Sequence, residues 1–329
     1  MNDLAIIILN WNGTEDTIEC LESLNTSAEY DVYVLDNGSE EPQKNALIDY
    51  CRSSKWADIF CVKEDADSMH ACEKRLVVYT SNENLGFAKG NNYLAQRLAP
   101  FYKEILLLNN DTVVPDNTIM SMHEKLKMSG CVAVTCDIRY FYDPECLWNA
   151  GGKFTFYGDR KYYSQKSIDR LEEKGKKFIY ADFITGCALM IDSNYIIQHG
   201  LFTDKFFHGE EDFNFCLLAK KRGEKLGVDL ESRLYHKVGK SIGAADSSEK
   251  TIKATIVHYS NRIIDYKEFY SAPKWLLWRE FYLGLASIKR ISSGMSPTAV
   301  SGMIKKIRKI TTEYDSVDKQ LFDSIMGRK

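Results

Sequence analysis

The sequence has 329 residues, of which 44% are hydrophobic and 27% are charged, a composition typical of a soluble globular protein with a sizeable core. Its net charge of −3 gives no general attraction to nucleic acid. The nine cysteines occur without a C-x-x-C pair, which favours reduced thiols in the cytoplasm over a disulfide framework or a zinc site.

The chain opens with a predicted βαβ unit. The apolar run at 4–9 indicates a buried strand, and it starts too early for a signal peptide. Asn10 ends this strand, and Thr14 is typical of a helix start. A second strand at 31–35 ends in Asp36. The G-x-G-x-x-G pattern is absent after the first strand, so we expect no dinucleotide site there.

A glycine-bearing loop follows the next predicted elements, a helix at 42–53 and a short strand at 76–79. The loop contains Asn84, Gly86 and Lys89 and leads into another helix. Such a loop lets a ligand approach the backbone closely. An ordinary loop with a helix cap is the alternative.

Two amides and a carboxylate end the most apolar strand of the sheet. The run at 105–108 leads through Asn109 into Asn110 and Asp111. In open α/β sheets ligands bind at this end of a strand, and oxygen ligands suit a divalent cation shared with substrate phosphates. An Asx-type turn is the alternative. With a helix from Pro115 and a strand at 131–135, the order predicts a parallel, doubly wound α/β sheet.

Three adjacent carboxylates stand at the start of a later helix. They are Glu210, Glu211 and Asp212, and they follow an irregular segment at 137–180 and a predicted buried strand at 183–191. The helix dipole favours one or two acids in a first turn. Three together would repel each other unless a cation or a proton-accepting role holds them.

A histidine-containing segment follows the last predicted strand, at 225–230. Residues 235–241 include His236, Lys237 and Lys240, a set suited to a metal and a diphosphate. A lone histidine is more often structural, and this reading stays open.

The chain after Ser248 is predicted to be helical, with helices at 249–270, 274–291 and 297–314. No apolar run reaches the ~18 residues of a membrane span. Eight Lys or Arg and one acid lie between residues 274 and 310. These helices could pack on the core, form a homodimer interface or rest on anionic lipid. The lipid hypothesis uses the basic residues together with Trp275, Trp278, Phe281 and Tyr282.

With these residues in view, the sequence resembles the family 2 glycosyltransferases of the GT-A fold, especially the bacterial rhamnosyltransferase-like branch. The resemblance rests on eight motifs in order: LNWNG (9–13), LDNGS (35–39), NLGFAKGNN (84–92), LLNNDT (107–112), AGG (150–152), ITGCALMI (184–191), GLFTDKFFHGEEDFNFC (200–216) and YHKVGKS (235–241). It implies a GT-A domain over residues 1–245, with a mostly parallel central sheet flanked by helices, and a C-terminal helical region over 246–329.

The resemblance also implies a reaction and a set of partners. It implies an inverting hexosyltransferase that uses a nucleoside-diphosphate sugar and Mn²⁺ or Mg²⁺. The basic and aromatic C-terminal helices add the hypothesis that the acceptor is a saccharide or a lipid-linked saccharide in cell-surface polysaccharide synthesis. A lipid-linked acceptor would bring the enzyme to the inner face of the membrane as a peripheral protein.

Individual residues match the family's functional positions. Asp212 matches the general base, with Glu211 beside it in acceptor recognition, and Glu210 departs from the family's usual single E-D pair. Asp111 and His236 match metal ligands. The residues expected to bind the donor are Asn10, Asp36, Asn84, Gly86, Lys89, Asn110 and Lys237.

Two other functions remain open. An inactive nucleotide-sugar-binding protein would have no need to retain both Asp111 and Asp212. A nucleotidyltransferase that makes the sugar nucleotide should carry a glycine-rich loop with Arg and Lys after the first strand, and LNWNG contains neither cation.

Overall fold

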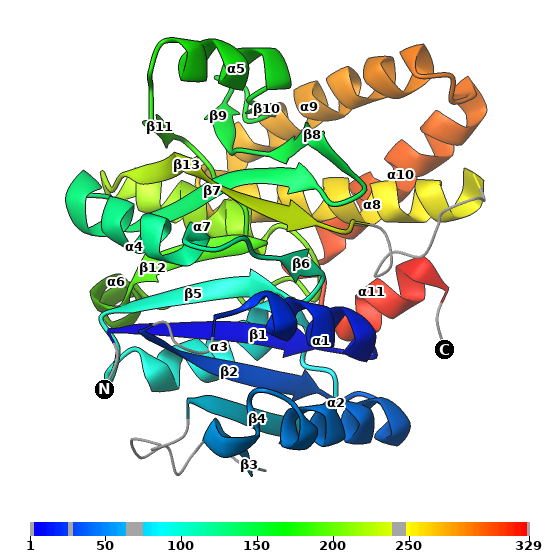
Figure 1. Cartoon of the computed structure of the whole chain (residues 1–329). Helices are drawn as coiled ribbons and strands as arrows, with labels where there is room; N and C mark the ends of the chain where they lie inside the picture. The colour runs from blue at the N-terminus through cyan, green and yellow to red at the C-terminus, as the bar shows by residue number, and fades with distance from the viewer. Residues whose placement is uncertain (1–2, 26–28, 64–74, 239–247, 328–329) are drawn as a thin grey trace.

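Strands and helices alternate through the first half of the chain and build a large sheet with helices on both faces (Figure 1). The computed structural model describes residues 3–25, 29–63, 75–238 and 248–327. The strands are β1 (Leu4–Asn10), β2 (Tyr30–Asn37), β3 (Phe60–Lys63), β4 (Leu76–Ser81), β5 (Glu104–Asn109), β6 (Thr112–Val113), β7 (Ala133–Tyr140), β8 (Asp143–Asn149), β9 (Gly152–Phe154), β10 (Arg160–Tyr162), β11 (Phe178–Ala181), β12 (Ala188–Asp192) and β13 (Leu226–His236). Among the described residues, 11 strands form the main sheet in the order β11-β13-β7-β12-β5-β1-β2-β4-β3, with β6 beside β13 and β8 beside β7, while β9 and β10 form a separate pair.

The helices cover both faces of this sheet. They are α1 (Thr14–Ser23), α2 (Glu41–Ser53), α3 (Gly86–Leu98), α4 (Thr118–Ser129), α5 (Gln165–Glu173), α6 (Ser193–His199), α7 (Glu211–Lys221), α8 (Ser248–Asp265), α9 (Ala272–Ser292), α10 (Pro297–Glu313) and α11 (Lys319–Met326), with 3-10 turns η1 (Ala57–Ile59) and η2 (Tyr266–Glu268). Because side chains alternate along a strand, Ile6 and Ile8 of β1 pack in the core with α1, α2 and α4. Ala5 and Ile7 pack in the core with α3, α6 and α7. Strands apolar on both faces are typical of a sheet covered on both sides.

Several strands run against the parallel order that the sequence predicts: β12 lies inside the sheet, and β6, β8 and β11 pair antiparallel with β13 or β7. β1, β2, β4 and β5 pair in parallel with one another, but β12 lies antiparallel between β5 and β7, with Ala188 opposite Leu108 and Met190 opposite Val134. The predicted strand at 183–191 is therefore shorter and reversed. Since β12 runs in the opposite sense, its amino end lies at the same edge as the carboxyl ends of β5 and β7.

The other predicted strands of the first half are confirmed, and several elements differ from the prediction. The segment at 137–180 contains β8, β9, β10, α5 and β11, of which β8 and β11 join the main sheet. The last strand continues past 230 to His236, so this histidine lies on a strand. β3 and α11 are additional elements, and the predicted loop at 63–75 lies mostly outside the described residues.

The C-terminal helices build a third apolar core that reaches into the rest of the protein. Trp275, Trp278 and Tyr282 are at most 9% exposed in this core, which also contains Phe206. The prediction that these three rings face lipid is therefore wrong, because they pack inward.

The predicted domain boundary at 245 lies outside the described residues. Among the residues that the structure describes, no helix is long and apolar enough to cross a membrane, and the eight cysteines described are free thiols.

Candidate active site

The sheet brings the predicted site residues to one edge. Asn10, Asp36 and Asp111 stand at or just after the carboxyl ends of β1, β2 and β5. β13 is parallel to β7, so its last residue, His236, lies at this edge too. The amino end of β12 lies here as well, and Gly186, just before it, donates its N–H to the Asp212 carboxylate (3.2 Å). Residues separated by 200 positions therefore meet at the edge where α/β sheets bind ligands.

Asp111 and His236 form a buried pair. The Nε2 atom of His236 lies 3.0 Å from Oδ1 of Asp111, and the two side chains are 8% and 10% exposed. Strand pairing fixes their backbones, since His236 stands opposite Thr112 and Lys237 N–H donates to the Asp111 carbonyl (2.9 Å). The indole of Trp148 meets the imidazole at a ring-centroid distance of 4.3 Å. The imidazole can hardly turn away from Asp111.

This pair fits a divalent cation that keeps other ligands. Two ligands at right angles, each about 2.1 Å from an octahedral ion, lie about 3 Å apart, close to the spacing of Nε2 and Oδ1. The described residues contain no group of three His, Cys, Asp or Glu side chains that could hold a metal. Diphosphate oxygens and water would therefore complete the coordination, as Mg²⁺ prefers. The Nδ1 atom of His236 is buried without a hydrogen-bond partner among the described residues.

A chain of polar side chains connects the ends of β1, β2 and β5. Asn10 donates to Asp36 (2.9 Å) and accepts from Thr17 (2.9 Å), and Asn110 donates to the same Thr17 hydroxyl (3.0 Å). A Cβ atom on Gly13 would stand 2.8 Å from the Asn110 amide, so this approach favours glycine. Asp36 is fully buried, and a direct contact with a nucleobase would require one of its hydrogen bonds to exchange.

The loop that contains Asn84 and Gly86 contacts β2 and the segment before α7. We call α7, which follows Glu210 and begins with Glu211 and Asp212, the acidic helix. Asn37 donates to Asn84 (3.2 Å), and Asn84 in turn accepts from the N–H of Gly86 (2.8 Å). Gly86 has φ +81°, and a Cβ there would lie 2.8 Å from the Phe207 carbonyl, so glycine is required. Lys89 is exposed on α3.

The third acid has a cationic partner. Glu210 is buried and forms an ion pair with Arg160 of β10, whose guanidinium also lies over the Phe213 ring, 3.1 Å from its centroid. Glu210 takes φ +87°, an uncommon value for a residue other than glycine. Arg160 is therefore a cation that the three adjacent acids led us to expect. No Lys or Arg of the described residues forms an ion pair with Glu211 or Asp212.

Burial changes the proton affinity of these two carboxyl groups. Asp212 is partly exposed, and burial raises its pKa to about 6, while the charge of Arg160 opposes the shift. Burial and the neighbouring Asp212 raise the pKa of Glu211 to about 8. Glu211 Oε2 is buried without a partner among the described residues. Asp212 therefore loses its proton at lower pH than Glu211, so Asp212 is the carboxyl group better suited to accept a proton.

Cys187 lies between the Asp111–His236 pair and α7. Its carbonyl accepts from the N–H of Asn109 (2.8 Å), two residues before Asp111 in the chain. Burial raises the pKa of its thiol, and the carboxylates of Asp111 and Asp212 add to the effect. Both carboxylates are thus close enough to act on one thiol.

Lys237 points away from this pair. Its ammonium donates to Asp16 (3.0 Å) and Glu19 of α1 and is 4% exposed. To bind phosphate it would have to leave both acids. Lys240 and Ser241 of the same motif lie outside the described residues.

Two residues that the sequence interpretation did not name contribute to this arrangement. Thr17 joins Asn10 to Asn110, and Arg160 neutralises Glu210. The three adjacent acids indicated that a cation was needed, but the irregular segment at 137–180 contains many Lys and Arg side chains that could supply it. Only the hairpin geometry distinguishes Arg160.

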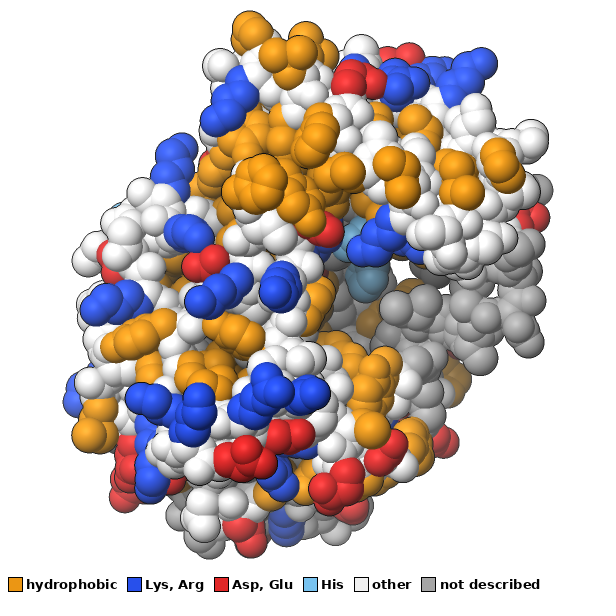
Figure 2. Space-filling model, turned by 90° about the horizontal axis from the view of Figure 1, so that it is seen from above, with side chains coloured by type: hydrophobic (Ala, Val, Ile, Leu, Met, Phe, Trp, Pro, Cys, Tyr) orange, Lys and Arg blue, Asp and Glu red, His pale blue; other side chains and the backbone are white. Residues whose placement is uncertain are grey.

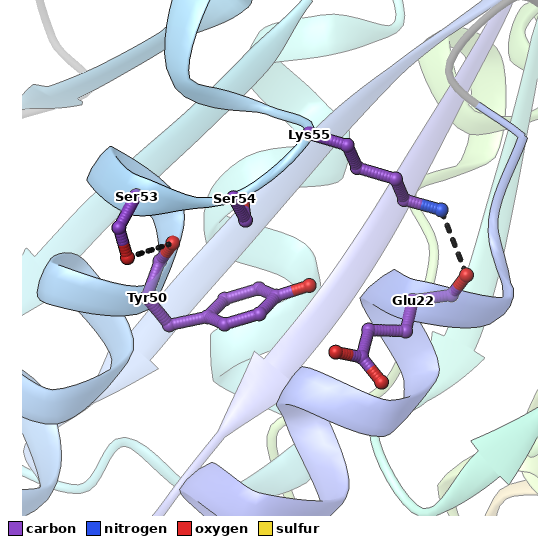
Figure 3. A pocket seen from close by; sticks show the side chains of 5 residues that line it. All are labelled: Glu22, Tyr50, Ser53, Ser54 and Lys55. Atoms are coloured by element: carbon purple, nitrogen blue, oxygen red, sulfur yellow. Dashed lines mark hydrogen bonds between the residues drawn. The ribbon is translucent and has the colours of Figure 1, made fainter.

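A polar pocket of about 340 Å³ lies elsewhere, between α1 and α2. It is lined by Glu22, Tyr50, Ser53, Ser54 and Lys55 (Figure 3). Lys55 donates to the Glu22 carbonyl (2.7 Å), and the Tyr50 hydroxyl points toward the Glu22 side chain. Helices that follow parallel strands end at the opposite edge of the sheet, so this pocket is separate from the residues above.

The fold is similar to that of known GT-A glycosyltransferases. No protein-family model and no curated protein sequence matches the chain. Among solved structures it resembles the crystal structure of GalNAc-T7 with UDP, GalNAc and Mn²⁺ (TM-score 0.62, 13% identity), covering 98% of this chain and 56% of that one. It also resembles mannosyltransferase PcManGT from Pyrobaculum calidifontis in complex with GDP-Man and Mn²⁺ (TM-score 0.55, 14% identity), covering 99% and 86%. The predicted GT-A fold is confirmed, and this chain spans little more than half the length of the first protein.

Proposed function

We propose that the protein is an inverting, metal-dependent glycosyltransferase that moves a hexosyl group from a nucleoside-diphosphate sugar to a saccharide acceptor. The observation that carries the proposal is one edge of a GT-A sheet with the Asp111–His236 pair and the partly exposed Asp212. The first group suits a diphosphate-bound cation, and the second suits proton removal. The bound UDP and GDP-mannose of the two similar structures support a sugar-nucleotide donor.

Asp111 and His236 would hold Mn²⁺ or Mg²⁺, which would offset the charge of the departing nucleoside diphosphate. Asn10, Asp36 and Asn110 would hold the donor near this pair, and the backbone at Asn84 and Gly86 would approach it closely. Lys89 and Lys237 remain predicted donor-binding residues. Lys237 would first have to break its ion pairs with Asp16 and Glu19 of α1.

Asp212 would accept the proton of an acceptor hydroxyl as the oxygen attacks the sugar carbon. A sugar hydroxyl has a far higher pKa than a carboxyl group, so the proton moves during attack and not before it. Glu211, protonated and buried beside Asp212, would donate a hydrogen bond to the acceptor. With one acting carboxylate and no second nucleophile assigned, a single displacement with inversion follows.

Two alternatives make different predictions. An inactive nucleotide-sugar-binding protein would bind donor but release no nucleoside diphosphate. A nucleotidyltransferase would consume a sugar phosphate and a nucleoside triphosphate. The raised pKa of Asp212 favours transfer, because a base that titrates near neutral pH suits proton abstraction.

The lipid hypothesis keeps the exposed Phe281 and replaces the three buried rings by other side chains of α9. Leu277, Phe281, Ile288 and Ile291 form an apolar stripe along α9 and are 76%, 53%, 67% and 45% exposed. Beside it, a groove of about 590 Å³ is lined by apolar residues of α9 and α10 and by Lys305 and Arg308. An apolar stripe beside basic residues suits the surface of an anionic membrane, where a lipid-linked acceptor would be found.

A thermal-shift screen tests the function. UDP, GDP, dTDP and their sugars are added with Mn²⁺, with Mg²⁺ or with chelator. We expect at least one nucleoside diphosphate to raise the melting temperature only when metal is present. No stabilisation by any of them would contradict the proposed function.

A further inference from the structure

The hairpin β9–β10 stands directly beside the acidic helix. Arg160 lies opposite Phe154 and Tyr162 opposite Gly152, so these positions share one face of the hairpin. Arg160 connects this face to Glu210. The hairpin is therefore fixed at the start of the helix that carries Asp212.

Aromatic rings continue from the hairpin to Asp212. The Tyr162 ring lies 5.1 Å from that of Phe183, and Phe183 lies 5.3 Å from Phe213, whose N–H donates to the Asp212 carboxylate (2.8 Å). Burial raises the pKa of Tyr162, Arg160 lowers it and the Asp212 charge raises it, so the two side chains act on each other.

The glycine motif at 150–152 permits this arrangement. A Cβ on Gly152 would lie 2.5 Å from the Phe183 ring and 2.4 Å from the Lys161 carbonyl. Only glycine lets Phe183 lie against the hairpin beneath Tyr162. The function proposed above gives this motif no other task.

The hairpin is also held from its outer side. The Trp278 indole donates to the Tyr157 carbonyl (2.9 Å), and the Tyr266 hydroxyl donates to the Gly158 carbonyl (3.2 Å). Arg262 pairs with Asp159 (2.7 Å). The C-terminal helices thus fix the backbone of the hairpin, and a surface held in advance loses little freedom on binding.

Two aromatic side chains of the hairpin face solvent. Tyr162 is 48% exposed and Phe156, in the turn, is 94% exposed. Seen from above, the molecule has a large patch of apolar side chains that borders a hollow where acidic and histidine side chains are visible (Figure 2). Exposed rings beside polar groups mark a binding surface.

We propose that Tyr162 forms the subsite where a pyranose ring of the acceptor stacks and presents a hydroxyl to Asp212. The C–H groups on one face of a pyranose are apolar and weakly positive, and they match the negative face of an aromatic ring. The hydroxyls at the ring edge meet the carboxyl groups. This inference rests on the proposed function and names the acceptor side of the same site.

Saturation-transfer NMR tests the subsite. The probes are methyl pyranosides of glucose, galactose, mannose, rhamnose and N-acetylglucosamine, in the presence of nucleoside diphosphate and the diamagnetic Mg²⁺, with irradiation of aromatic protons. We expect signal on ring C–H protons of at least one probe. Tyr162→Ala should weaken binding roughly tenfold, while Tyr162→Phe keeps it. Tyr180→Ala, an equally exposed tyrosine on the edge strand β11, should have no effect.

The outcomes separate the subsite from the function. Nucleoside-diphosphate affinity is measured on the same samples and should be equal in all variants, which also shows that Tyr162→Ala is folded. No saccharide signal, or a signal unchanged in Tyr162→Ala, overturns the proposed subsite. If nucleoside diphosphate still binds in a metal-dependent way in that case, the proposed glycosyltransferase function stands. Loss of nucleotide binding in the parent protein would contradict the function itself.

Discussion

The Nε2 atom of His236 lies 3.0 Å from Oδ1 of Asp111, although 125 residues separate them in the chain. The pairing of β13 with β6 creates this contact, because it places His236 opposite Thr112. His236 ends β13, and Asp111 lies in the two-residue turn between β5 and β6. Strand pairing therefore positions the two proposed ligand atoms, and groups held by regular structure keep their geometry better than groups on long loops.

The first prediction concerns the metal. In the parent protein, nucleoside diphosphate should bind much more tightly with Mn²⁺ than with chelator, because the described residues around Asn110 offer little free positive charge to two phosphates. Asp111→Ala and His236→Ala should each remove the metal dependence in calorimetric titrations. Asp116→Ala removes an exposed carboxylate from the same segment and should change nothing. Equal affinity with and without chelator in the parent would contradict the metal assignment.

The second prediction concerns the base. Asp212→Asn keeps the size of the side chain but cannot accept a proton, so transfer should fall by ~10²–10⁴ while donor affinity persists. Release of nucleoside diphosphate in the presence of the saccharide probes measures transfer. Normal transfer by this variant together with loss in Glu211→Gln would assign the base to Glu211.

The third prediction concerns pH. A base acts only when unprotonated, and burial raises the pKa of Asp212 to about 6. The transfer rate should therefore fall about tenfold per pH unit below pH 6, instead of below the pH near 4 that is usual for an aspartate. Arg160 lowers this pKa, so Arg160→Met should move the inflection to higher pH. An unchanged profile in a folded Arg160→Met protein would contradict the assignment.

The sequence predicted where the candidate residues lie in the fold better than it predicted what surrounds them. Polar residues after apolar runs placed Asn10, Asp36 and Asp111 correctly at strand ends, because strand periodicity is a local property. The reversal of β12 and the ion pair of Arg160 with Glu210 depend on contacts between distant segments. No local pattern encodes them.

The tryptophans of α9 also show that the sequence alone does not tell which side chains are buried. Trp275 and Trp278 occur among basic residues, and their composition alone fits lipid or core equally well. The helix has two faces, and only its packing against α8 and α10 decides that the tryptophans are buried while Leu277 and Ile288 are exposed. A helical period of 3.6 residues predicts two faces without saying which one is covered.

The last prediction concerns the membrane, and vesicle co-sedimentation measures it. Lys305, Lys306 and Lys309 are exposed on α10, whereas Arg308 pairs with Glu280 (2.6 Å) and is left unchanged. Binding should require anionic lipid and weaken with salt, and changing these three lysines to Gln should weaken it roughly 100-fold, since each contributes about 1 kcal/mol. Leu277→Ser with Ile288→Ser should weaken it further by removing the apolar stripe. Lys166, Lys174 and Lys176 changed to Gln remove equal charge from the segment around α5 and should leave binding intact. If the parent protein is absent from the pellet at low salt, the hypothesis of membrane binding by α9 and α10 is wrong. The acceptor would then be a soluble saccharide.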